Sequence, residues 1–200
     1  MALQQDAVST VLAIDVSWAM DQFHIWPATF EAVVALNDEV RASRPDDDLE
    51  FVTFSAYAER IVRSDLSGLT WDESILGTNL QHAALLAHEI LDTSACPVRR
   101  LIVVTLGDPS AHLDNDRSYF AYPPSPVMIR ETLAALHACR AAGISVTCIL
   151  VKPSNMHPGT EQSVVEFAFA LFGIIGVRIV RSSVDRVAAD LRAVYFNEPA

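Results

Sequence analysis

Two hydrophobic periodicities alternate along this chain, and their alternation restricts the fold more than any other feature of the sequence. Short runs rich in β-branched residues are separated by longer segments in which apolar residues recur at helical spacing. This alternation predicts a mostly parallel sheet that is covered by helices on both faces. The expected strands are residues 10–14, 50–54, 60–63, 101–105, 145–151 and 177–180.

The second and third expected strands are separated only by residues 55–59, which is too short for a parallel crossover. We therefore expect them to form an antiparallel hairpin at one edge. The fold class that follows is α/β: a Rossmann-like, doubly wound, mostly parallel six-stranded sheet with one antiparallel edge strand and helices on both faces.

The helical segments show apolar stripes that we assign to the core. Ser182 and Asp185 have capping-box spacing and predict the start of a last helix. Residues 112–126, which carry prolines and aromatic residues, predict a long loop, and a compact domain tolerates such a loop mainly for function. The stripes are Phe30, Val33, Val34 and Val40; Leu80, Ala83, Ala84, Ala87, Ile90 and Leu91; Ile129, Leu133 and Leu136; and Val184, Val187, Ala188, Leu191 and Val194.

Size and composition narrow the class of protein. A chain of 200 residues with 51% apolar content fits a single domain over residues 1–200. The net charge of -11, with Lys152 as the only lysine, argues against nucleic acid and membrane surfaces as partners. The start of the chain has no signal-peptide pattern, which predicts a cytoplasmic protein. The three cysteines form no C-x-x-C pair and are expected to be buried thiols.

Polar side chains follow the expected parallel strands at the positions where α/β sheets bind ligands. Asp15 and Ser17 follow the first strand, Thr78 opens a helix, and Asp108 follows the fourth strand. Carboxylates and hydroxyls are the oxygen ligands that a hard cation such as magnesium prefers. We expect these side chains to gather at the carboxyl edge of the sheet.

With these residues in place, the chain resembles the von Willebrand factor A (vWA) domains over nearly its whole length. The metal-ion-dependent adhesion site of that family is written D-x-S-x-S, followed by a distant threonine and a distant aspartate. The likeness is greatest to a bacterial cytoplasmic branch in which a G-T-N turn supplies the threonine and strand four ends in T-D-G-E-P. Asp15, Ser17 and Thr78 fill the first, second and fourth of these ligand positions.

The chain departs from the family pattern at two ligand positions. Ala19 replaces the second serine and has no donor oxygen, and Leu106 stands where the metal aspartate is expected. Asp108 could supply a carboxylate only if its loop shifted. We therefore expect a degenerate adhesion site, formed by Asp15, Ser17, Thr78 and Asp108, that binds Mg²⁺ or Mn²⁺ weakly or not at all.

Each of these residues also has a structural interpretation. Thr78 is equally suited to be the N-cap of the next helix, and Asp108 before Pro109 is typical of a turn. His82 and His88 lack the spacing of a zinc-binding helix, so we expect them at the surface or its boundary. The candidate partner-binding residues are Trp18, His112, Tyr119 and Tyr122, for which packing within the domain is the alternative.

Two functions from different classes follow from these observations. The first is a protein-interaction module, for which the family resemblance implies an AAA+ ATPase of the MoxR type as partner. The second is a magnesium-dependent phosphatase of the haloacid-dehalogenase type with Asp15 as nucleophile and Thr105 as a phosphate-binding hydroxyl. That chemistry requires a carboxylate two residues after the nucleophile, where Ser17 stands. Nucleotide-binding and hydrolase motifs are also absent, so the chain is expected not to be an enzyme.

Overall fold

The computed structural model describes residues 7–69, 76–153, 166 and 170–197. Its main sheet has six strands in the order β3-β2-β1-β4-β7-β8, and only β3 is antiparallel to its neighbour. The strands are β1 (Val8–Asp15), β2 (Asp48–Phe54), β3 (Ala58–Ile61), β4 (Val98–Thr105), β7 (Ser145–Lys152) and β8 (Arg178–Ser183). The helices that are described from end to end are α1 (Trp18–Gln22), α2 (Trp26–Ser43), α3 (Leu80–Asp92), α4 (Pro126–Ala141) and α6 (Val187–Asn197), with a 3₁₀ turn at Arg63–Gly68.

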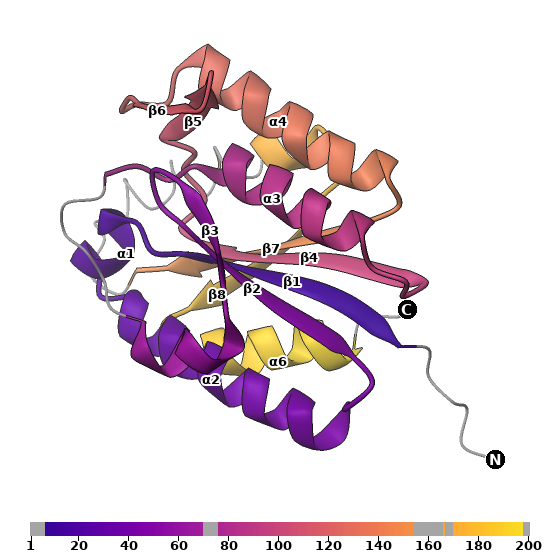
Figure 1. Cartoon of the computed structure of the whole chain (residues 1–200). Coiled ribbons are helices and arrows are strands. Elements are labelled where there is room, and N and C mark those ends of the chain that lie inside the picture. Colours follow the sequence, from indigo (N-terminus) through magenta and orange to yellow (C-terminus); the bar gives the residue numbers. More distant parts are fainter. Residues whose placement is uncertain (1–6, 70–75, 154–165, 167–169, 198–200) are drawn as a thin grey trace.

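Helices cover both faces of this sheet, as the alternating pattern predicts (Figure 1). Helices α3 and α4 pack together on one face, and α2 and α6 pack together on the other. Strand β1 is buried along its whole length because its alternate residues supply both cores. Val11 and Ala13 belong to the core under α3, and Leu12 and Ile14 belong to the core under α2. The predicted α/β fold class is confirmed.

The β2–β3 hairpin confirms the predicted antiparallel edge, although the third strand begins earlier than expected. It covers Ala58–Ile61 rather than residues 60–63, because the turn closes within a few residues when the Ser55 amide donates to the Tyr57 carbonyl at 2.9 Å. Beyond Ile61 the chain leaves the sheet and enters the 3₁₀ turn.

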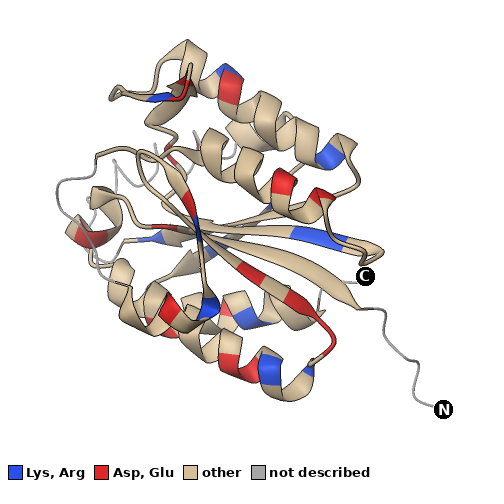
Figure 2. Cartoon of the chain, viewed as in Figure 1, with Lys and Arg blue, Asp and Glu red and all other residues tan. Residues whose placement is uncertain are grey.

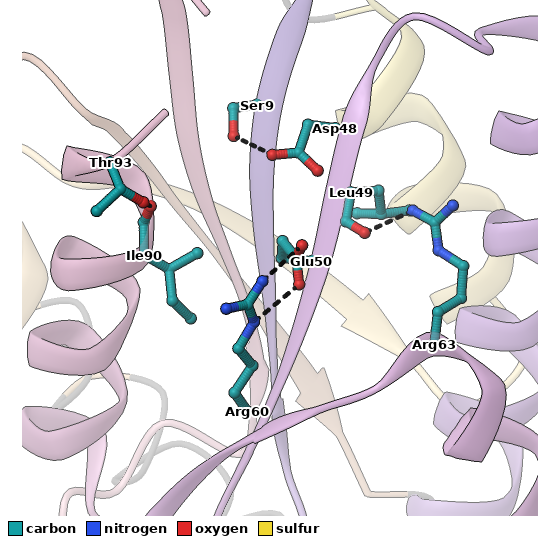
Figure 3. A network of polar contacts seen from close by, with 8 residues as sticks. All are labelled: Ser9, Asp48, Leu49, Glu50, Arg60, Arg63, Ile90 and Thr93. Atoms are coloured by element: carbon teal, nitrogen blue, oxygen red, sulfur yellow. Dashed lines mark hydrogen bonds and ion pairs between the residues drawn. The ribbon is translucent and has the colours of Figure 1, made fainter. Parts of the chain in front are cut away.

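Charged side chains fasten this edge of the sheet (Figure 3). The Arg60 guanidinium contacts both carboxylate oxygens of Glu50, at 3.1 and 2.9 Å. Arg63 donates to the Leu49 carbonyl at 2.6 Å, so it ties the 3₁₀ turn back to β2. Charges on an edge strand also discourage pairing with other chains.

Two sequence predictions of local structure are wrong. Residues 112–126 do not form one long loop, because β5 (Ala111–Asp114) and β6 (Arg117–Phe120) pair in a small separate sheet. Asn115 and Asp116 form its turn with φ values of 48° and 62°, which asparagine and aspartate tolerate better than most residues. Ser182 does not cap the last helix, because it pairs with Val151 inside β8 and α6 begins only at Val187.

The helical stripes are largely confirmed as core. Helix α3 buries every predicted position except Ile90, which is partly buried and packs against the same core. In α2 and α4, Phe30, Val34, Ile129 and Leu133 are partly buried, and in α6 Ala188 is exposed. The charges of α3 are confined to its last turns, as Figure 2 shows, so the helix presents an uncharged surface to α4. Within the described residues, every helix is too short or too polar to cross a membrane.

Candidate functional site

The carboxyl ends of β1 and β4 lie side by side at the centre of the sheet, on the left in Figure 1. From β1 the chain continues to β2 on one side and later returns to β4 on the other side. A sheet of this kind has its ligand crevice at such a reversal of strand order. Asp15 ends β1 and Thr105 ends β4, so both are placed at this point by the register of the central strands.

Asp15 forms the buried base of the site. Its carboxylate accepts a hydrogen bond from the Thr105 hydroxyl at 2.6 Å and another from the Ser17 amide at 2.9 Å. Burial raises the pKa of Asp15 above its ordinary value, and the hydrogen bonds from Thr105 and Ser17 offset part of that rise. Because Asp15 is completely buried, its carboxylate holds the two loops in position and is not presented to solvent.

Thr105 is a site residue that the sequence suggests only for the phosphatase alternative. Its hydroxyl donates to Asp15 and accepts from the Gly107 amide at 3.0 Å. It therefore connects the end of β1 to the loop after β4. The signal was present in the sequence, since a threonine at the end of a central strand faces the same crevice as the residue ending the neighbouring strand.

Thr78 is placed by backbone contacts with the loop after β4. Its amide donates to the Ser110 hydroxyl at 3.0 Å, and its carbonyl accepts from the Ala111 amide at 3.2 Å. Gly77 precedes it with a φ of 108°, and an added Cβ there would lie 2.8 Å from the Ala111 Cβ. A glycine is therefore needed where these two segments meet.

The N-cap of α3 is Asn79, so the alternative that gave this role to Thr78 is wrong. The Asn79 side chain accepts from the His82 amide at 3.0 Å and donates to the Ala56 carbonyl at 2.8 Å. His82 is half-buried and accepts from the Ala58 amide through Nδ1 at 2.9 Å, and burial lowers its pKa. Both residues join α3 to the β2–β3 turn rather than facing a ligand.

Ser17, Thr78 and Asp108 come together around a pocket of about 390 Å³ at this edge. Ser17 is 2% exposed, and its hydroxyl forms no well-aligned hydrogen bond with another described residue, although it lies close enough to Asp15 to lower the pKa of that carboxyl. Asp15 lies beneath the pocket and is not part of its wall. The pocket is lined by Ser17, Trp18, Ala19, Phe23, Leu76, Gly77, Thr78, Leu106, Asp108, Ser110, Phe120 and Tyr122.

Asp108 is the acidic residue of the pocket wall. Burial raises its pKa from 3.8 to about 6. The pKa of Tyr122 is also raised, first by burial and then by the negative charge of Asp108. The negative charge of Asp108 therefore acts on Tyr122 at the rim of the pocket.

Exposed aromatic side chains surround the pocket. Trp18, Phe120 and Tyr122 are 45%, 51% and 66% exposed, and all three line it. Of the candidate partner-binding residues, only Trp18 and Tyr122 belong to this rim. His112 and Tyr119 do not line the pocket, and their rings pack against each other across β5 and β6 at 5.7 Å. The hairpin register selects Phe120 instead of Tyr119, because neighbouring residues of a strand point to opposite faces.

The side chains present do not match the oxygen set of a divalent cation. Ala19 and Leu106 have no side-chain oxygen, and the Asp15 oxygens accept from Thr105 and Ser17. Of the expected metal ligands, Ser17, Thr78 and Asp108 line the pocket. Across the described part of the chain, no group of three or more histidine, cysteine, aspartate or glutamate side chains lies close enough together to hold a metal ion.

Solved structures with the same fold include domains of bacterial pilus proteins. The vWF domain of the type V pili tip protein Mfa5 from Porphyromonas gingivalis matches with a TM-score of 0.72 and 11% identity, covering 96% of each chain. The pilus adhesin SpaC from Lactobacillus rhamnosus GG, in its open conformation, matches with a TM-score of 0.71 and 14% identity, covering 97% of this chain and 30% of the adhesin. BatB from Bacteroides thetaiotaomicron matches with a TM-score of 0.63 and 16% identity, covering 94% and 99%.

Sequence comparison finds longer relatives. Uncharacterized proteins of Mycobacterium tuberculosis and Mycobacterium bovis are 31% identical over 188 residues, which is 90% of this chain. The match covers 26% of these relatives, so this chain spans about a quarter of their length. The model of the family described as "Rv0959-like protein, vWA domain" matches residues 8–196. The chain belongs to this family of vWA domains.

Proposed function

We propose that this vWA domain is a protein-interaction module that docks a partner at the carboxyl edge of its sheet. The observation that carries the proposal is the pocket at that edge, with Trp18, Phe120 and Tyr122 exposed around it. Large aromatic side chains around a concave, mostly apolar site are typical of the centre of a protein interface.

The geometry favours binding over the phosphatase alternative. A nucleophilic carboxylate must reach its substrate, whereas the Asp15 side chain is 0% exposed and lies outside the pocket wall. The second carboxylate that such chemistry needs has Ser17 in its place. Asp15 is better suited to support the two loops from below.

A MoxR-type AAA+ ATPase in the cytoplasm is the partner class that the family resemblance favours. Direct docking, without an essential metal ion, is consistent with Ala19 and Leu106 at two ligand positions. Calorimetric titration of Mg²⁺ and Mn²⁺ into metal-free protein should give weak or no binding. A micromolar dissociation constant that is lost in both Asp15→Ala and Asp108→Ala would instead establish a working metal site.

Site-directed cross-linking in the native host tests the docking face. A photoreactive amino acid in place of Tyr122 should give a defined cross-linked protein, which mass spectrometry then identifies. The matched control is the same amino acid at Ala95, which is exposed in the loop before β4 at the opposite end of the sheet.

The variant Trp18→Ala should remove the cross-link from position 122 while the thermal unfolding temperature stays within a few degrees of the parent. Equal cross-linking from positions 95 and 122, or a product unaffected by Trp18→Ala, would overturn the proposal. An ATPase among the products would support the partner class, and another protein in its place would refute that class alone.

A further inference from the structure

The pocket at the carboxyl edge combines a negative charge with walls that contain no positive charge. Asp108 is the charged side chain of the lining, and none of the described lining residues is lysine, arginine or histidine. Among the described residues, Asp108 has neither a hydrogen bond nor an ion pair. A partly buried carboxylate in this position is complementary to a cation supplied from outside.

Residues with neutral side-chain oxygen atoms line the same pocket as Asp108. Ser17 lines the same pocket, and its buried hydroxyl forms no hydrogen bond with another described residue. The side chains of Thr78 and Ser110 also line it, and the Ser110 hydroxyl already accepts from the Thr78 amide. A ligand group with several N–H donors could therefore bond to Asp108 and to Ser17 together.

The rest of the wall is apolar and aromatic. Trp18, Phe120 and Tyr122 stand at the mouth, and Phe23, Leu76 and Leu106 extend the apolar surface. A small, strongly hydrated metal ion gains nothing from such walls. A long side chain with an aliphatic stem and a flat cationic end gains from both parts, through apolar contact along the stem and stacking of the cation on aromatic rings.

We propose that the pocket takes an arginine side chain of the partner protein, with its guanidinium at Asp108 and Ser17 and its stem between the aromatic rings. This inference rests on the proposed docking function and names the chemistry that the partner presents. It reverses the polarity of the family's adhesion site, because the positive charge comes from the partner and not from a metal ion. The net charge of -11 also favours a basic partner.

Nuclear magnetic resonance titration with small probes tests this chemistry. N-acetyl-arginine amide should shift the amide signals of Gly107 and Asp108 and the indole signal of Trp18 in a saturable manner. N-acetyl-citrulline amide has nearly the same shape without the charge, and we expect it to bind at least tenfold more weakly. Magnesium chloride and N-acetyl-glutamate amide serve as the metal and acidic probes.

Variants distinguish binding of the arginine probe in the pocket from the general attraction of a cation to an acidic protein. Asp108→Asn should weaken binding of the arginine probe at least tenfold, because it removes the charge and keeps the shape. Asp46→Asn changes an exposed acid in the turn between α2 and β2, at the opposite end of the sheet, and should leave the binding unchanged. Trp18→Ala should weaken binding severalfold through loss of the stacking surface.

Three other results would each overturn the arginine proposal. Equal binding of citrulline would indicate a merely apolar pocket, and saturable magnesium binding that excludes arginine would indicate a metal site. No shift by the arginine probe at tens of millimolar would also refute it. If position 122 still cross-links specifically to a partner in that case, the docking function stands and only the chemistry of the occupant is wrong.

Discussion

Asp15 holds the loops of the site in place at a cost to the stability of the fold. Its carboxylate is fully buried, and burial raises its pKa, so the charged form is disfavoured relative to the unfolded chain. Hydrogen bonds from Thr105 and the Ser17 amide offset part of this cost. Such local destabilisation is common at functional sites, where stability is lost in favour of a particular geometry.

Replacing the charge of Asp15 by a neutral amide should therefore stabilise the fold. We expect Asp15→Asn to raise the free energy of unfolding at pH 7 by about 1 kcal/mol, because the amide oxygen still accepts from the Ser17 amide, the amide nitrogen can donate to the Thr105 hydroxyl, and no buried charge remains. Asp15→Ala should lower it, since the Ser17 amide and the Thr105 hydroxyl then both lose their buried partner. Urea unfolding measures both changes, and an Asp15→Asn variant less stable than the parent contradicts this account.

The raised pKa of Asp108 predicts the direction in which the stability of the fold changes with pH. Its pKa in the folded protein is raised to about 6, so the folded state binds its proton more tightly than the unfolded state does. Stability should increase as the pH falls from about 6 to about 4, by on the order of 1 kcal/mol given the partial exposure of the group. Below that window both states are protonated and the contribution stays constant.

The measurement compares urea unfolding of the parent and Asp108→Asn between pH 4 and 7. The difference in unfolding free energy between the two proteins should change across this window and be flat outside it. An identical pH profile for both proteins would show that Asp108 does not titrate differently in the folded state.

The segment before α3 and the β5–β6 hairpin depend on each other. The Thr78 carbonyl accepts from the Ala111 amide, and Gly77 lies against the Ala111 side chain. Phe120 is also close to Gly77, with 3.3 Å between its ring and the position of a Cβ added there. The hairpin thus positions one wall of the pocket through its contacts with this short segment.

Gly77→Ala should disturb both elements. The added Cβ meets Ala111 at 2.8 Å in a backbone conformation with a φ of 108°, so we expect a loss of about 2 kcal/mol or more in unfolding free energy. Gly68→Ala is the matched control, because no described residue lies within 4 Å of a Cβ added there, and it should be nearly neutral. Thermal unfolding compares the two; equal stability of both variants would contradict the proposed close approach.

At the scale of the whole molecule, the excess of acidic side chains opposes the compact state. The net charge is -11, and Figure 2 shows charged residues on the helices and along β2, β3 and β4. Repulsion among exposed charges is screened by salt over distances of about 10 Å at 0.1 M. Ionic strength should therefore affect the stability of the folded domain.

Raising sodium chloride from about 10 to 150 mM should increase the unfolding temperature by roughly 2–4 °C, which corresponds to about 1 kcal/mol for a domain of this size. Differential scanning calorimetry measures the change. Magnesium chloride at the same ionic strength should give a similar increase. A much larger increase with magnesium would reveal specific binding of the ion, and no increase with either salt would show that charge repulsion is negligible.

Much of the architecture was predictable because buried apolar residues recur along the chain at the spacing of a strand or of a helix. Strand β1 is apolar on both faces because helices cover both faces, and α3 shows its core stripe because one side packs on the sheet. The antiparallel edge followed from the short interval between β2 and β3. By contrast, Ser182 has the composition of a helix cap, and its pairing with Val151 in β8 overrides that local signal.

The sequence by itself determined the α/β class, the alternation of strands and helices, and the strand ends at which Asp15, Ser17, Thr78 and Asp108 stand. Those features depend on period and on chain order, which a linear pattern records. Only the tertiary structure decided that Asp15 is buried beneath the site and that Phe120, instead of Tyr119, joins the aromatic rim. These outcomes depend on strand register and on contacts between segments far apart in the chain, which local sequence does not encode.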